Sequence, residues 1–309
     1  MNIKKVFLPI LLMPSLTYSL VTYQVVTIGD PGNANDITGF GQVDYLYKIG
    51  IYQVTIAQYT EFLNAVAATD DNDLYNSCMT NVKNIAGVAR DGSEGNYTYS
   101  AIGSANRPIA CVSWFSAARF ANWMSNGQPQ GAQNSTTTEN GAYNLQGITN
   151  YAVRKNLINP NTGLAPTFFI PTENEWYKAA YYNGSGGYYL YATQSNNMPG
   201  NSIGSSLNQA NYFSNSTGFS ITQTTTFDPN QNYLVDVGSY IASNSYYGTF
   251  DQTGNLWEWN DFDGEPARSR GLRGCAYFST EPFIDSYYRV GYDPAKFGTN
   301  SGFRLAGPQ

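Results

Sequence analysis

Gly254-Asn255-Leu256-Trp257-Glu258-Trp259 is the stretch of this 309-residue chain that says most about the fold. Glycine and asparagine favour turns, and an alternation of aromatic and acidic residues follows them. On an extended strand, successive side chains point to opposite faces. Trp257 and Trp259 are therefore predicted to lie on one face of a short strand, with Glu258 on the other.

Three helices are predicted on either side of this strand. Thr55 can cap a helix over residues 56–68, and Ser113 can cap a helix that runs to about residue 125. A third helix begins at Thr172, where Thr172 and Glu175 have the spacing of a capping box. Short strands are expected at 23–28, 45–54, 272–278 and 303–305, and polar loops at 126–163 and 184–233.

Four further segments share a pattern with residues 254–259. They are YQVT at 52–55, PIACVSW at 108–114, IPTENEW at 170–176, and LRG at 272–274 followed by GFR at 302–304. In this order, the five segments resemble the sulfatase-modifying-factor family, whose members are of the formylglycine-generating-enzyme type. The resemblance spans residues 45–306.

The resemblance implies an α+β architecture with a modified C-type-lectin-like fold, short strands, about three helices and much irregular structure. One domain over residues 20–309 is expected. Arg304 of the GFR segment is expected to form a buried bidentate ion pair, with Glu173 or Glu175 as the candidate partners.

A calcium site is the metal centre that the resemblance implies. Carried over to this sequence, the family's ligands are the side chains of Asp251 and Glu258 and the carbonyls of Gly254 and Leu256. Oxygen ligands on a tight turn suit Ca²⁺. The alternative is a turn in which Asp251 caps local N–H groups and Glu258 meets an arginine.

The residues with which known family members do chemistry are missing. Formylglycine-generating enzymes bind copper with two cysteines placed after the RGGS segment, but residues 277–289 contain no cysteine. Ser279 stands near the first of those positions, and Cys275 is out of register. The chain also lacks histidine, so imidazole ligands for iron or copper are absent. Copper is therefore not expected, and the sequence leaves open whether any catalysis remains.

The composition limits the partners. The chain carries 16 basic and 22 acidic residues, a net charge of −6, which disfavours binding to nucleic acid. The three cysteines, Cys78, Cys111 and Cys275, allow at most one internal disulfide, and the sequence does not say which pair forms it.

The first nineteen residues are predicted to be a signal peptide. Lys4 and Lys5 precede an apolar run too short to span a bilayer, and small residues follow it. No later segment is apolar enough to cross a membrane. The chain is thus expected to be secreted, periplasmic or displayed on the cell surface.

Three functions fit these features. The first is a calcium-stabilised module that binds a glycan, a peptide or an envelope partner through Phe278, Tyr287, Tyr288 and Tyr292. The second is an enzyme with an unrecognised reaction in a groove at Cys275, with Ser279 and Arg289 as further candidate catalytic residues. The third is a structural component of the cell surface.

Overall fold

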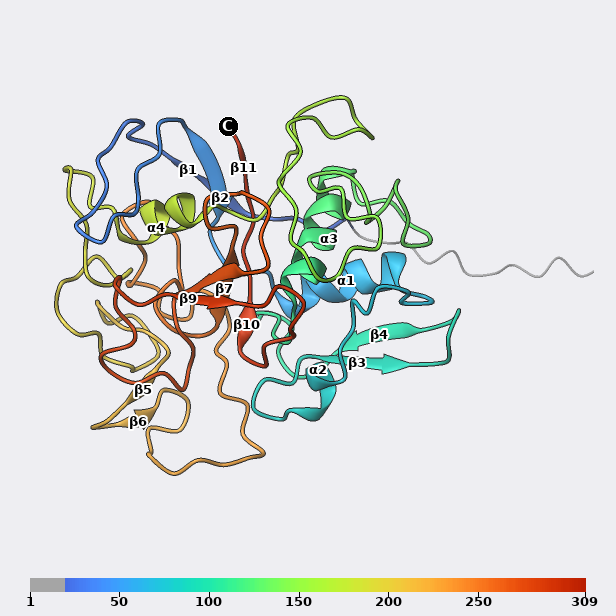
Figure 1. The fold of residues 1–309 in the computed structure, drawn as a ribbon. Coiled ribbons are helices and arrows are strands. Elements are labelled where there is room, and N and C mark those ends of the chain that lie inside the picture. The colour runs from blue at the N-terminus through green and yellow to red at the C-terminus, as the bar shows by residue number, and fades with distance from the viewer. Residues whose placement is uncertain (1–19) are drawn as a thin grey trace, which may run out of the picture.

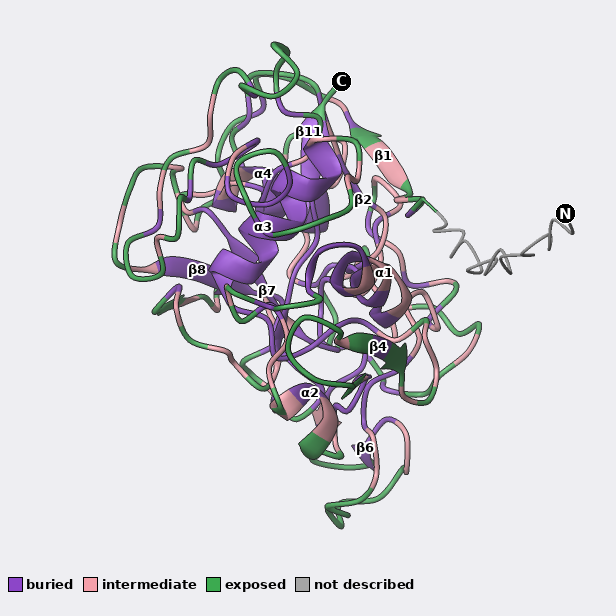
Figure 2. Ribbon diagram, turned by 90° about the vertical axis from the view of Figure 1, so that its right-hand side faces the viewer, coloured by how far each residue is buried: buried purple, intermediate pink, exposed green. Residues whose placement is uncertain are grey.

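The computed structural model describes residues 20–309, so the predicted signal peptide at 1–19 lies outside the described residues. Short elements are joined by long irregular segments around a buried centre (Figures 1 and 2). The helices are α1 (Ile56–Val66), α2 (Cys78–Asn81), α3 (Trp114–Ser125) and α4 (Glu173–Tyr181). The strands are β1 (Val25–Ile28), β2 (Tyr47–Gly50), β3 (Val88–Asp91), β4 (Thr98–Ala101), β5 (Phe213–Ser214), β6 (Gly218–Phe219), β7 (Trp257–Asn260), β8 (Arg270–Arg273), β9 (Val290–Tyr292), β10 (Ser301–Gly302) and β11 (Ala306–Pro308).

The predicted helix caps are confirmed. Thr55 and Thr172 each close a capping box with the residue three positions on, and Ser113 accepts a hydrogen bond from the backbone of Ser116. These caps satisfy N–H groups that a helix leaves unpaired at its start. One four-residue helix, α2, was not predicted.

Helix α3 is buried on every side, as Figure 2 shows, although its sequence predicts only one packing face. The cover on its outer side comes from the segment after it. Arg119 forms an ion pair with Glu139, and the Asn122 amide donates to the carbonyls of Thr138 and Tyr143. The polar segment 126–163, predicted to be a surface loop, thus also completes the core.

A four-stranded sheet in the order β10-β7-β8-β9 lies beside this core. Strand β8 ends at Arg273, earlier than predicted, because Gly274 and Cys275 take positive φ angles of 92° and 66° and turn the chain. The prediction of a strand at 303–305 is wrong. Residues 303–305 connect β10 with β11.

A three-stranded sheet in the order β1-β2-β11 joins the two ends of the described chain (Figure 1). Strand β11 pairs antiparallel with β2, so that Ala306 lies opposite Ile49. This pairing brings Arg304, just before β11, next to the end of β2.

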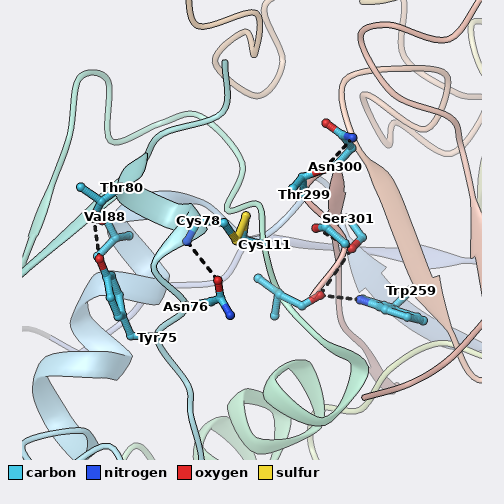
Figure 3. Close-up of a disulfide and its surroundings, with 12 residues drawn as sticks. Tyr75, Asn76, Cys78, Thr80, Val88, Cys111, Trp259, Thr299, Asn300 and Ser301 are labelled. Carbon is cyan, nitrogen blue, oxygen red and sulfur yellow. Dashed lines mark hydrogen bonds between the residues drawn. A yellow bond between two sulfur atoms is a disulfide. The ribbon is translucent and has the colours of Figure 1, made fainter. Parts of the chain in front are cut away.

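A disulfide joins Cys78 at the start of α2 to Cys111 (Figure 3). It closes a loop with a sequence separation of 33 residues. Cys275 is the free cysteine of the described residues, and it is buried. Within residues 20–309, no helix has the length and apolar character needed to cross a membrane.

We expect the double variant Cys78→Ser/Cys111→Ser to be less stable by about 3–4 kcal/mol, because the unfolded chain regains the freedom of the closed loop. Urea unfolding of the oxidised protein and the variant would measure the difference. A variant with unchanged midpoint and slope would contradict the expectation.

Candidate ligand-binding site

One face of the four-stranded sheet carries an apolar hollow of about 250 Å³. All four strands contribute to its lining, with Ser301 from β10, Trp257 from β7, Leu272 from β8 and Val290 from β9. Register explains this convergence, because Ser301 lies opposite Trp257 and Leu272 lies opposite Val290. The hollow has room for one ring or side chain rather than for a drug-sized ligand.

Aromatic rings form its walls. Trp257, Phe278 and Tyr292 line the hollow, and the Phe278 and Tyr292 side chains are 43% and 39% exposed. Trp259 is fully buried behind Tyr292, with ring centroids 6.0 Å apart. Trp257 and Trp259 thus share a face, as predicted.

The ligand-binding residues predicted from the sequence divide into two groups. Phe278 and Tyr292 reach the hollow directly. Tyr288 packs on Trp257 with centroids 5.7 Å apart and supports the wall from behind. Tyr287 is 60% exposed and does not line the hollow.

A polar edge borders the aromatic walls. Gly298, Thr299 and Asn300 line it, and the Asn300 amide donates to the Thr299 hydroxyl at 3.0 Å (Figure 3). No charged side chain lines the hollow. Its chemistry is therefore that of aromatic faces beside neutral hydrogen-bonding groups.

A second hollow, of about 480 Å³, lies on the opposite side of β9. Along the strand, Val290 and Tyr292 point into the first hollow, whereas Arg289 lines the second. Arg289 is held in a bidentate ion pair with Glu173, at 2.7 Å for both contacts, between the rings of Phe40 and Phe262. Arg289 therefore acts as part of an ion pair and not as a neighbour of Cys275.

Glu258 points to the face of the sheet away from the aromatic hollow, where it meets Arg304. Nε of Arg304 donates to Oε2 of Glu258 at 2.6 Å, and Nη2 donates to Oε1 at 2.7 Å. Both side chains are fully buried. Burial acts to lower the pKa of Arg304, but the Glu258 carboxylate raises it above its ordinary value.

This pairing corrects the prediction that Arg304 binds Glu173 or Glu175. Glu173 is already shared by Arg273 and Arg289. Glu175 caps α4 and accepts from the Tyr45 hydroxyl. Both acids of the IPTENEW segment therefore already have partners, Glu173 in two distant arginines and Glu175 in the start of its own helix.

The sequence model of the sulfatase-modifying factor enzyme 1-like domain matches residues 42–308. The chain belongs to this family. No curated protein matches the sequence. Among solved structures, the crystal structure of CarF matches with a TM-score of 0.54 at 18% sequence identity. The matched region covers 94% of this chain and 100% of the CarF chain. The structure titled Treponema denticola variable protein 1 matches with a TM-score of 0.53 at 18% sequence identity. That match covers 95% of this chain and 98% of the Treponema denticola chain.

These similarities bear on the fold alone, because the identities are low. They agree with the α+β arrangement described above, and the predicted modified C-type-lectin-like fold is confirmed.

The two candidate residues near the family's oxidase positions are a buried thiol, Cys275, and a hydroxyl, Ser279. The Cys275 thiol is buried and donates to the carbonyl of Phe283. Burial, followed by the negative charge of Asp285, raises the pKa of this thiol far above its ordinary value. The Ser279 hydroxyl accepts from the backbone of Ala276 in a turn. Cys275 is therefore a protonated thiol at neutral pH, and Ser279 carries no sulfur.

The predicted calcium ligands are engaged by other protein groups. The Glu258 carboxylate is engaged by Arg304 and by the Trp176 indole, and the Leu256 carbonyl accepts from the Gln53 amide at 3.1 Å. Asp251 accepts from the Gly238 backbone at 2.7 Å, and burial raises its pKa to about 6. The groups present therefore do not fit the implied ion as they are arranged, and calcium stays a prediction.

Several residues of the site carried no sequence signal strong enough to identify them. Phe40 and Phe262 flank Arg289 from distant segments, and Thr299 and Asn300 belong to an ordinary polar loop. The positive φ angle of 52° at Phe262 places a bulky residue in a strained conformation, which the sequence does not reveal.

We expect Cys275 to be unreactive toward a thiol reagent in the folded protein at pH 8, because its thiol is buried and protonated. Full labelling should appear only after denaturation. The Cys78→Ser/Cys111→Ser variant, denatured and labelled in parallel, gives the signal of a single thiol. Rapid labelling of the native protein would restore Cys275 as a candidate nucleophile.

Proposed function

We propose that the chain is an exported, non-oxidase member of its family that binds a neutral glycan at the apolar hollow on the four-stranded sheet. The observation that carries the proposal is the lining of that hollow, with Trp257, Phe278 and Tyr292 as walls and an uncharged edge at Thr299 and Asn300.

The chemistry of the lining favours a sugar. A pyranose has an apolar face of C–H groups and a rim of hydroxyls. Aromatic faces match the first, and neutral amide and hydroxyl groups match the second. An uncharged lining gives no partner for a phosphate, a sulfate or a charged peptide side chain.

The absence of oxidase chemistry is supported by the thiols. Copper in the family needs two cysteines, and here Cys78 and Cys111 are joined in a disulfide. The remaining Cys275 is buried with a strongly raised pKa. The same two properties weigh against an enzyme that uses Cys275 in another reaction.

The glycan proposal is tested with an array of neutral oligosaccharides, followed by isothermal titration of the best one. We expect Tyr292→Ala and Phe278→Ala each to weaken binding about tenfold or more, which corresponds to ~1.4 kcal/mol for a lost stacking ring. Tyr287→Ala is the matched control, because Tyr287 is more exposed than either and lies outside the hollow.

Equal losses in all three variants would contradict the assigned site. Binding to apolar peptides but to no oligosaccharide would replace the glycan by a peptide. A protein that binds neither probe would refute the proposed function.

Export rests on residues 1–19, which the sequence predicts to be cleaved. We expect a mature N-terminus at or near Leu20 when the full-length chain is produced in its exporting host. Sequencing of the extracytoplasmic protein checks this expectation. Retention of Met1 would contradict it.

A further inference from the structure

Arg304 occupies a cage of five oxygen atoms. Two belong to the Glu258 carboxylate, at 2.6 and 2.7 Å. The other three are the carbonyls of Gly50 at 3.0 Å, Ile51 at 3.1 Å and Phe250 at 2.8 Å. These acceptors come from the last residue of β2 and the residue after it, from the irregular segment before β7, and from β7 itself.

Every donor of the guanidinium is used in this cage. The group has five N–H bonds, and the five contacts satisfy one at Nε, two at Nη1 and two at Nη2. The planar fork of an arginine matches the carboxylate in a way that a lysine could not. The Arg304 side chain is therefore fully buried with every donor hydrogen-bonded.

A mixture of one carboxylate with backbone carbonyls is also a set of ligands that calcium takes in proteins. We propose that the Arg304 guanidinium serves as the internal cation that neutralises Glu258, so that the fold does not depend on calcium at the position that the resemblance implies.

Two further contacts engage the implied calcium ligands. Oε2 of Glu258 accepts from Trp176 as well as from Arg304, and the Leu256 carbonyl is taken by Gln53. Asp251 lines a cavity of about 10 Å³ with Tyr240 and Thr253, and its carboxylate, like that of Glu258, interacts electrostatically with Arg304. A divalent ion beside Glu258 would also be repelled by the adjacent guanidinium.

The first test is the melting temperature of the wild-type protein in chelator and in millimolar calcium chloride, with metal content measured by elemental mass spectrometry. We expect the same melting temperature in both and no stoichiometric calcium. A site filled far above its Kd would instead raise the melting temperature by several degrees. A drop on chelation would overturn the proposal.

The second test opens the cage. Arg304→Ala leaves Glu258 and three carbonyls without their cation, and we expect its melting temperature to fall and then to recover in part when calcium is added. The matched control is Arg304→Ala/Glu258→Gln. It leaves the same empty space at position 304 but lacks the Glu258 negative charge, so calcium should not change its melting temperature. A folded Arg304→Ala protein that ignores calcium would overturn the equivalence of guanidinium and ion.

Arg304→Lys and Arg304→Met cover the case in which the alanine variant does not fold. Their side chains have similar length, but only lysine carries a charge. We expect the lysine variant to melt at a higher temperature than the methionine variant. Equal melting temperatures would show that the cage does not need a cation, which would refute the proposal.

Discussion

The buried contact between Arg304 and Glu258 is the interaction on which the rest of the structure depends. Removing two charges from water is costly, and such a pair persists only when its remaining hydrogen-bonding groups are also satisfied. Here the carbonyls of β2 and of the turn at Phe250 provide those partners. One side chain thus fixes the end of one sheet against the central strand of the other.

The same contact determines the position of the candidate binding face. Because Glu258 must face Arg304, the alternation of β7 sends Trp257 and Trp259 to the opposite face. That face is where Leu272, Val290 and Tyr292 complete the hollow. The ion pair and the binding site are therefore the two sides of one strand, although they share no side chain.

Local features of the sequence could be predicted well, whereas partners across the fold could not. Thr172 and Glu175 are three residues apart, so their capping box follows from spacing alone. The partner of Arg304 lies 46 positions away, and several acids compete for it. Residues 272–278 have the composition of a strand, yet the positive φ angles at Gly274 and Cys275 end it. A side chain at position 274 would come within 3.2 Å of Trp176, a tertiary contact that composition does not reveal.

For the site, Phe278 and Tyr292 could be identified by residue type, but Arg289 could not be assigned to a hollow. Its direction depends on the register of β9 with β8, and a shift by one residue would exchange the two faces. The polar edge at Thr299 and Asn300 is recognisable only when β10 places it beside Trp257.

The pairing of β11 with β2 has a consequence for the order in which the protein folds. Strand β2 and Glu258 are synthesised before Arg304. Until Arg304 is present, the Glu258 carboxylate has no positively charged partner that would offset the cost of burying it. Contacts of such large sequence separation close late and slowly. A nascent chain therefore cannot complete this core until the segment 301–308 has emerged, so the last step of folding follows the synthesis of nearly the whole domain.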